Sequence, residues 1–163
     1  MAAARILSGI LCAAFIGSLG LPDRNLLSKA KAEIGVREAS GRNDGKRVEE
    51  YLRCVGLKKG DPYCAAFVSF CFRQSGYAKP RTGWSPDLFP TKRLVKKPAA
   101  GNVFGIYFPE LKRVAHCGLV DKVDGDWLLV IEGNTNASGA RDGEGVYARR
   151  RHRRTIRCYA DWL

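Results

Sequence analysis

A cysteine, a histidine and a glutamate are the residues of this chain whose surroundings suit nucleophilic catalysis. Cys64 follows Pro62 at the start of an apolar segment, and proline is favoured in the first turn of a helix. A thiolate at a helix N-terminus is stabilised by unpaired backbone N–H groups and by the helix dipole. The same N–H groups can receive the oxyanion of an acyl-transfer intermediate. We therefore predict Cys64 as a nucleophile, against the commoner case of a buried structural thiol.

His116 is the candidate base. It falls in a predicted strand, where alternation puts Gly118 on the same face and leaves room for a thiol beside the imidazole. A Cys–His pair needs the histidine to keep the thiol ionised and then to protonate the leaving amine. The alternative is a strand histidine that is simply hydrogen-bonded. The second histidine, His152, lies among arginines and is expected to be solvated.

Glu132 closes the apolar strand that follows His116. A carboxylate in this place is costly to bury without a partner. Pairing with His116 would satisfy it and fix the tautomer of the imidazole. Asn134 is predicted to share or supplement that role. The alternative for Glu132 is an exposed acid at the end of a strand.

The elements that must position these residues follow from the hydrophobic pattern. Helical spacing predicts a helix over residues 22–34 with Asp23 as its N-cap, and a short amphipathic helix around residues 48–55. A buried helix follows from Pro62 to Gly76, and then an ordered surface loop over residues 78–100 that carries Trp84. Five short strands are predicted at 103–108, 115–123, 127–131, 145–150 and 155–159. Helices followed by an antiparallel meander predict an α+β domain.

The length of 163 residues suits one domain. Residues 1–20 carry one charge, Arg5, then an apolar run and small residues, which predicts a signal peptide and an exported domain over residues 21–163. An uncleaved membrane anchor is the alternative. Cleavage would leave an odd number of cysteines, so at least one thiol would stay unpaired. Either four of these cysteines pair or all are free.

The formal net charge of +12 fits an acidic partner, either nucleic acid or an anionic envelope polymer. The run Arg149–Arg154 resembles a nucleic-acid patch, but alternate arginines of a strand point to opposite faces. We expect a solvated face or envelope adhesion, and no nucleic acid, because an exported protein rarely meets it. The chain has no Cys-x-x-Cys spacing, so no zinc site and no cofactor are predicted.

Three segments resemble the motifs of CHAP domains, relatives of the NlpC-type cell-wall hydrolases. Residues 62–69 (PYCAAFVS) resemble the cysteine motif, 115–120 (AHCGLV) the histidine strand, and 131–134 (IEGN) the E-x-N segment. Residues 97–103 (KPAAGNV) are similar to a Gly-Asp-Val stretch, with Asn102 in place of the Asp. The motifs occur in the family's order across nearly the whole of residues 21–163. Cys117 departs from the small or β-branched residue usual there.

The resemblance implies a papain-like α+β fold in which Cys64, His116, Glu132 and Asn134 take the catalytic roles. It implies amide hydrolysis in peptidoglycan, by a muramoyl-L-alanine amidase or by an endopeptidase of stem peptides or crossbridges. No acidic calcium loop precedes Cys64, so no metal is carried over. We expect Tyr63 and Trp84 in the substrate groove, and a monomer. The alternatives are a toxin-like effector amidase and an inactive wall-binding module.

Overall fold

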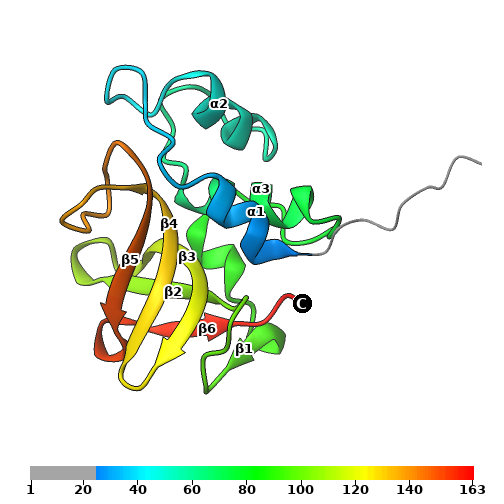
Figure 1. The fold of residues 1–163 in the computed structure, drawn as a ribbon, viewed down its shortest axis with the longest axis vertical. Helices are drawn as coiled ribbons and strands as arrows, with labels where there is room; N and C mark the ends of the chain where they lie inside the picture. The colour runs from blue at the N-terminus through cyan, green and yellow to red at the C-terminus, as the bar shows by residue number, and fades with distance from the viewer. Residues whose placement is uncertain (1–24) are drawn as a thin grey trace, which may run out of the picture.

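Six strands form one antiparallel sheet in a computed structural model that describes residues 25–163 (Figure 1). The strands are β1 (Leu94–Val95), β2 (Val103–Phe108), β3 (Arg113–Asp124), β4 (Trp127–Thr135), β5 (Gly145–His152) and β6 (Cys158–Ala160). Their order in the sheet is β1-β6-β2-β3-β4-β5. The predicted α+β class is confirmed, and β2 to β5 form the expected meander. The last strand, however, returns to the far side of β2 and pairs there with β1, which lies inside the segment predicted as loop.

Three helices complete the described part of the chain: α1 (Leu26–Ala32), α2 (Lys46–Arg53) and α3 (Cys64–Gln74). The first begins later than predicted, because the side chain of Asn25 caps it by accepting a hydrogen bond from the Ser28 N–H at 3.0 Å. The predicted cap Asp23 and the predicted signal peptide lie outside the described residues. None of the helices within residues 25–163 has the length and apolarity to cross a membrane.

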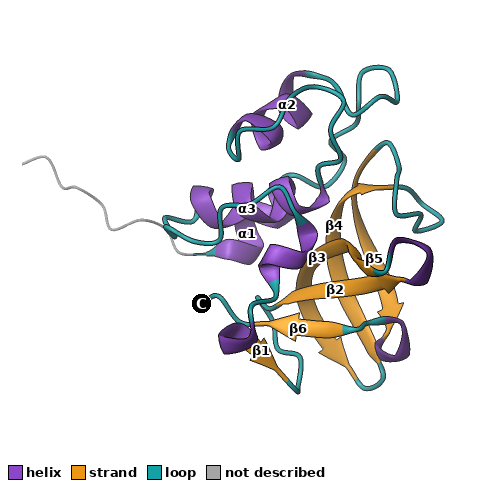
Figure 2. Ribbon diagram, turned by 180° about the vertical axis from the view of Figure 1, so that it is seen from behind, coloured by secondary structure: helices purple, strands orange, loops and turns teal. Residues whose placement is uncertain are grey.

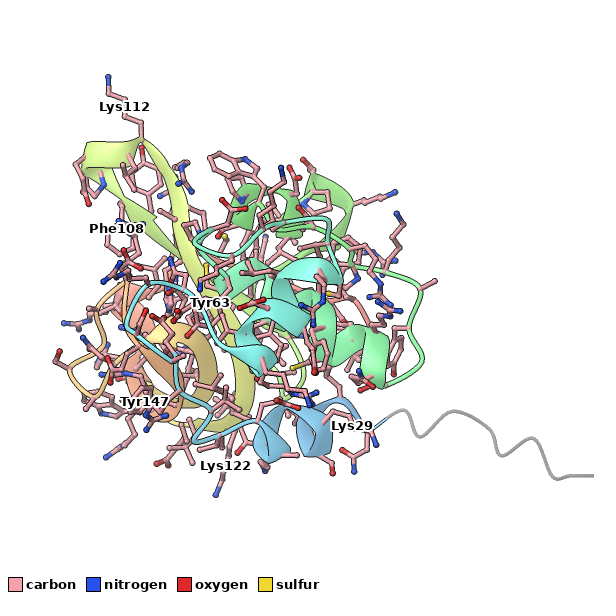
Figure 3. All side chains as sticks on the ribbon, turned by 90° about the horizontal axis from the view of Figure 1, so that it is seen from above. Lys29, Tyr63, Phe108, Lys112, Lys122 and Tyr147 are labelled. Carbon is pink, nitrogen blue, oxygen red and sulfur yellow. The ribbon has the colours of Figure 1, made fainter. Side chains whose placement is uncertain are left out.

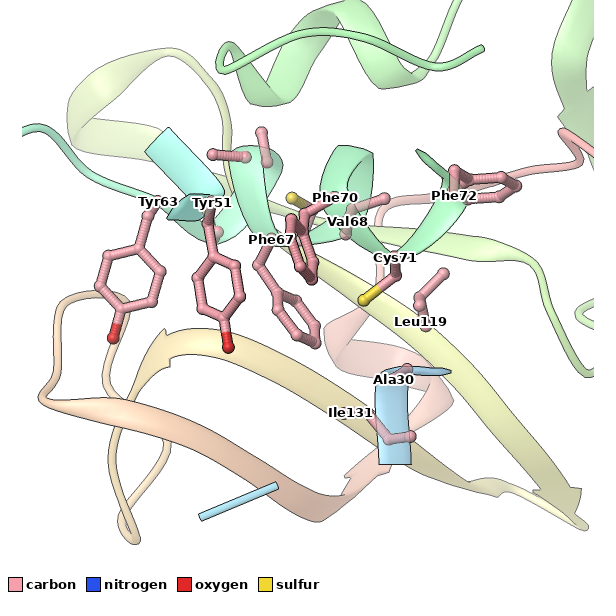
Figure 4. Close-up of a cluster of buried hydrophobic side chains, with 14 of the residues drawn as sticks. Ala30, Tyr51, Tyr63, Phe67, Val68, Phe70, Cys71, Phe72, Leu119 and Ile131 are labelled. Atoms are coloured by element: carbon pink, nitrogen blue, oxygen red, sulfur yellow. The ribbon is translucent and has the colours of Figure 1, made fainter. Parts of the chain in front are cut away.

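Helix α3 lies in the centre of the molecule and packs against the sheet and against both other helices (Figure 2). Its residues from Cys64 to Phe72 are all buried, as expected for a segment that is apolar nearly all round. Figure 4 shows Phe67, Val68 and Cys71 of α3 in the cluster that also holds Leu119 and Ile131 of the sheet. The core therefore fixes the helix against β3 and β4.

The opposite face of the sheet carries a second, smaller cluster. It consists of buried side chains of β2, β3, β4 and β6: Phe104, Val120, Leu128, Val130 and Tyr159. Cys117 and Leu119 belong to the cluster under α3, whereas Val120 belongs to the second one. Neighbouring residues of β3 thus contribute to the clusters on both faces of the sheet.

The segment between α3 and β2 is fastened to the middle of α3. The Ser69 hydroxyl donates to the carbonyl of Thr82 at 2.8 Å and accepts from its N–H at 3.0 Å. Arg81 donates to the Ser69 carbonyl at 3.0 Å. A 3₁₀ helix, Ser85–Leu88, follows directly. These bonds bring Ser85 beside the first turn of α3.

Candidate active site

Cys64 is the first residue of α3, with Tyr63 at the N-cap position. Pro62 therefore precedes the helix instead of lying in its first turn. The N–H groups of the first turn have no partner within a helix, so they surround the thiol with donors. Cys64 is 5% exposed, and it opens into a pocket of about 150 Å³ whose walls include Trp84, Ser85 and Ala115. Cys64 thus lies at the start of the helix, where the sequence predicted it.

His116 and Glu132 form a buried pair that joins β3 to β4. The imidazole Nε2 lies 2.8 Å from the Glu132 Oε2, and both side chains are at most 1% exposed. With Nε2 occupied, Nδ1 is the nitrogen left for proton transfer, and it has no hydrogen-bond partner among the described residues. The predicted partnership of His116 with Glu132 is confirmed.

Gly118 makes room for this pair, although for a different neighbour than predicted. A Cβ atom at Gly118 would lie 2.9 Å from Cγ of Glu132 and 2.6 Å from the Ile131 carbonyl oxygen. Such distances are well inside van der Waals contact. The missing side chain therefore leaves space for the glutamate of the next strand, not for the thiol.

Arg151 of β5 holds the other side of Glu132, a contact that the sequence did not indicate. Its Nε donates to Oε1 at 2.6 Å, and its Nη2 donates to Oε2 at 2.6 Å. The arginine side chain is 14% exposed. Two parallel charge-assisted bonds of this kind fix both the charge and the orientation of a carboxylate. The result is a chain of contacts from Arg151 through Glu132 to His116.

The pKa values of these groups are shifted in directions that favour an ion pair. Hydrogen bonding from Cys117 holds the pKa of the Cys64 thiol well below its usual range, against the opposing effect of burial and with further help from His116 and Ser85. Burial opposes the charge on His116, but Cys64 and Glu132 outweigh it and raise its pKa to about 9. Burial raises the pKa of Glu132, but the hydrogen bonds from Arg151 and His116 outweigh this effect and lower that pKa to about 2. These directions favour a thiolate, an imidazolium and a carboxylate in the site.

Ser85 and Cys117 surround the Cys64 sulfur. The Ser85 Oγ lies 3.4 Å from Sγ of Cys64 and 3.9 Å from Sγ of Cys117. Burial and the neighbouring Cys64 raise the pKa of Cys117 well above its usual range. Cys117 is therefore a neutral donor, and Cys64 carries the charge. Ser85 was missed because its segment has no periodicity from which its direction could be read.

Two predicted site residues lie elsewhere. Tyr63 is fully buried beside Tyr51, with ring centroids 6.1 Å apart (Figures 3 and 4), so the substrate-groove role predicted for it is wrong. Asn134 has a left-handed backbone, φ 57°. With Nδ2 as donor, its amide reaches Asn43 Oδ1 at 2.9 Å and the Gly143 carbonyl at 3.2 Å. It ties two loops together and makes no hydrogen bond with His116 among the described residues.

The basic run does not form a single charged surface. Arg149 donates to the Ala137 carbonyl at 2.7 Å, and Arg151 reaches Glu132, while Arg150 stacks on Trp127 and lies 3.8 Å from Asp124. Alternation along β5 thus sends one arginine into the site. The run is neither wholly solvated nor a continuous patch. The five cysteines from Cys54 onward are free, which answers the open question of pairing for the described residues.

No group of three or more His, Cys, Asp or Glu side chains within residues 25–163 is placed to hold a metal ion. His152, the second histidine, accepts a hydrogen bond from the Arg154 N–H at 3.1 Å and packs edge-on against Trp127. It lies on β5 and makes no hydrogen bond with Cys64 or His116 in the described part of the chain. His116 is therefore the histidine of the candidate site.

Comparison with protein-family models and with curated proteins finds no match. Among solved structures, the chain is similar to one described as "The crystal structure of Ly7917", with a TM-score of 0.45 and 15% sequence identity. The alignment covers 85% of this chain and 61% of that chain, so the present chain spans less than two thirds of its neighbour's length. Support for a function comes from the chain's own residues.

Proposed function

We propose that this chain is a cysteine amidohydrolase that cleaves an amide bond of peptidoglycan. The observation that carries the proposal is the series Arg151–Glu132–His116, together with the electrostatic interaction between His116 and the Cys64 thiol in the first turn of a helix. A series that orients an imidazole toward an activated thiol is the arrangement that nucleophilic acyl transfer requires. The resemblance of the motifs around these residues to CHAP domains supports a papain-like relationship and the choice of substrate.

The first half of the reaction forms a thioester. The Cys64 thiolate attacks the carbonyl carbon, and the charge that develops on oxygen is received by backbone N–H groups of the first turn of α3. The Ser85 hydroxyl, 3.4 Å from the sulfur, adds a side-chain donor. When the C–N bond breaks, His116 gives its Nδ1 proton to the leaving amine. Glu132 keeps the Nε2 proton in place and stabilises the imidazolium until that step.

The second half regenerates the enzyme. Water attacks the thioester, His116 takes its proton on Nδ1, and the bond between carbon and sulfur breaks to release the carboxylic acid and the Cys64 thiolate. A raised pKa of about 9 on His116 keeps the imidazolium populated before acyl transfer. The rate should therefore fall as the pH rises through about 9, because the leaving amine then loses its proton donor.

Two features favour a cell-wall polymer as the substrate. The thiol lies at the bottom of an open pocket next to the exposed Trp84, which is 49% exposed, so a long chain can reach it. The net charge of +12 favours approach to anionic envelope polymers. Export of residues 21–163 after cleavage of the leader, as the sequence predicts, would place the protein there. We propose that it acts as a monomer.

The proposal is tested by mass spectrometry of purified peptidoglycan after incubation with residues 21–163, beside the Cys64→Ala variant. Free glycan strands with intact stem peptides would identify an amidase. Shortened stems or opened crosslinks would identify an endopeptidase. The variant should release no product and still sediment with the wall, because Cys64 contributes chemistry and little binding surface.

Equal product from the variant and the parent protein would overturn the role of Cys64. Sedimentation of both proteins without any product would favour the wall-binding module. Iodoacetamide modification of Cys64 in the parent protein serves as a control that the thiol was reduced during the assay.

A further inference from the structure

The pocket beside Cys64 contains two arginines for which the catalytic series provides no role. Arg113, at the start of β3, and Arg141, in the β4–β5 loop, both line it. They lie in different segments of the chain, and both line this pocket. Their presence on the wall next to a nucleophile is the observation from which the inference starts.

Neither guanidinium has an acidic partner among residues 25–163. Arg113 lies over the Trp84 ring, with its Cζ 4.0 Å from the ring centroid, and donates to the Val114 carbonyl at 3.2 Å. Arg141 lies 5.8 Å from the centroid of Phe108. No ion pair of either residue occurs in the described part of the chain, whereas Arg47 and Arg151 each hold a glutamate. Their positive charge is therefore available to a ligand.

Arg113 is also held in place. Stacking on an indole restricts the guanidinium to a plane while leaving its N–H edge free to donate. The β2–β3 hairpin that carries it projects from the sheet, and Figure 3 shows Lys112 at its outer tip. The guanidinium is thus presented toward the pocket by a strand and a tryptophan, which reduces the entropy lost when it binds an anion.

The rest of the pocket lining is mostly apolar and carries one acidic residue. Leu57, Pro62 and Asp61 belong to it, and the Asp61 carboxylate accepts the Lys58 N–H at 2.8 Å. A ligand next to Cys64 would therefore meet two arginines and a single acid.

We propose that Arg113 and Arg141 bind a free carboxylate of the substrate next to the scissile amide. The substrate class is then an acidic peptide, one whose side-chain or α-carboxylate beside the cleaved bond is not amidated. Guanidinium groups form the bidentate, charge-assisted bonds that such a carboxylate accepts. The inference rests on the proposed function, and it names the form of the stem peptide that this site prefers.

The first experiment compares two reagents that react with thiols and differ in charge. Iodoacetate carries a carboxylate one carbon from its reacting atom, and iodoacetamide carries an amide there. The rates of Cys64 modification are followed by peptide mass spectrometry in the full chain, in the single variants Arg113→Gln and Arg141→Gln, and in the double variant. Both substitutions together should lower the ratio of the iodoacetate rate to the iodoacetamide rate by about tenfold.

Arg150→Gln is the matched control, because it removes one positive charge from another arginine that stacks on an exposed tryptophan, Trp127. It should leave the ratio unchanged. An equal fall in both rates in the pocket variants would mean altered access to the thiol and would overturn the proposal. An unchanged ratio in the double variant would overturn it as well.

The second experiment uses soluble muropeptides with free carboxylates and the same muropeptides after chemical amidation. The parent protein should cleave the free acids with a kcat/KM about ten times higher. The double variant should lose this preference, chiefly through KM. Equal cleavage of both forms by the parent protein would contradict the inference.

The two experiments separate the two proposals. A shift in the reagent ratio without cleavage of any muropeptide would retain the carboxylate site and contradict the peptidoglycan function. Cleavage of both muropeptide forms at one rate, with no shift in the reagent ratio, would retain the function and reject the carboxylate site.

Discussion

The first turn of α3 and its middle each carry a buried cysteine, and the two behave oppositely. Cys64 is 5% exposed and Cys71 is fully buried. Burial raises the pKa of Cys71 well above its usual range, and nearby Glu33 adds to the effect. The pKa of Cys64 is lowered, chiefly by a hydrogen bond from Cys117 and against the effect of burial. Partners at the end of the helix, and not burial, therefore distinguish a candidate nucleophile from a structural thiol.

Two buried glutamates give a second comparison. Glu33 accepts from Arg47 at 2.8 Å and from the Tyr51 hydroxyl at 2.6 Å, whereas Glu132 is held by Arg151 and His116. The first cluster joins α1 to α2 and all of its polar groups are used. The second leaves Nδ1 of the imidazole without a hydrogen-bond partner among residues 25–163. A buried ion pair alone therefore does not indicate a functional site. A buried ion pair that includes a titratable atom without a hydrogen-bond partner does.

The sharpest test of the first comparison is the reactivity of the two thiols. Iodoacetamide should modify Cys64 in the folded protein at rates hundreds of times or more above that of Cys71, because only a thiolate reacts and Cys71 stays protonated and enclosed. The rate at Cys64 should also persist well below pH 8. Quantitative mass spectrometry of the two cysteines across pH measures both quantities.

Cys71→Ala is the companion variant. It should keep the activity of the parent protein and lose about 1 kcal/mol of unfolding free energy through the small cavity that it leaves. Similar reactivity of Cys64 and Cys71 in native buffer would remove the distinction on which the assignment of the nucleophile depends.

The local parts of the site were predictable because each has a local signal. Pro62 before an apolar helix marks Cys64, and a carboxylate at the end of an apolar strand marks Glu132. Arg151 and Ser85 lack such signals. The direction of Arg151 depends on the register of β5 against β4, in which it lies opposite Leu128, and a shift by one residue would turn it to the other face.

The fold was predictable to the same extent as the site, because its local elements have local signals and its long-range pairings do not. Periodicity gave the helices and the strands β2 to β5, since each buries a face within its own segment. It could not place β6 beside β2, because that pairing joins residues more than fifty positions apart. Tyr63 was misplaced for a similar reason: its burial depends on packing against Tyr51 of another helix.

The second comparison is tested by removing the arginine from each cluster. Arg151→Met should cost about 3 kcal/mol of unfolding free energy, because it leaves a buried carboxylate with one partner. It should also lower the fraction of Cys64 thiolate at neutral pH, since Glu132 would then hold its charge less firmly beside His116. Arg47→Met should destabilise the protein less, as its side chain is 42% exposed, and should leave the thiolate unaffected. Urea titration and thiolate absorbance give the two readouts.

The pH dependence of stability follows from the same groups. The lowered pKa of Glu132, about 2, contributes stability that is present above its unfolded value of 4.5 and is lost as the pH falls through about 2. The raised pKa of His116 contributes stability that is present below 6.5 and is lost as the pH rises through about 9. Arg151→Met should move the acid limb to higher pH. If Arg151→Met and Arg47→Met lost similar amounts of unfolding free energy, and the thiolate absorbance stayed unchanged in both, the role of Arg151 would be purely structural.

The smallest expected effect concerns Cys117, whose thiol lies next to the Cys64 sulfur. This neighbour distinguishes Cys64 from the other cysteines of the described chain. Oxidised glutathione should react with the Cys64 thiolate, forming a mixed disulfide and releasing one reduced glutathione. The Cys117 thiol, once deprotonated by solvent, should then displace the second glutathione and leave a Cys64–Cys117 disulfide. Activity should fall on oxidation and return with dithiothreitol.

Cys117→Ser distinguishes this course from simple blockage of the nucleophile. The variant should keep the glutathione adduct on Cys64, whereas the parent protein should yield a linked pair of peptides without an adduct. Since Cys117 also donates the largest stabilising hydrogen bond to the thiolate, and a serine hydroxyl can replace that donor, its activity before oxidation should change by only a few-fold. An adduct that persists in the parent protein would mean that the two sulfurs do not meet, and the contrast between Cys64 and Cys71 would then have to rest on His116 and Ser85.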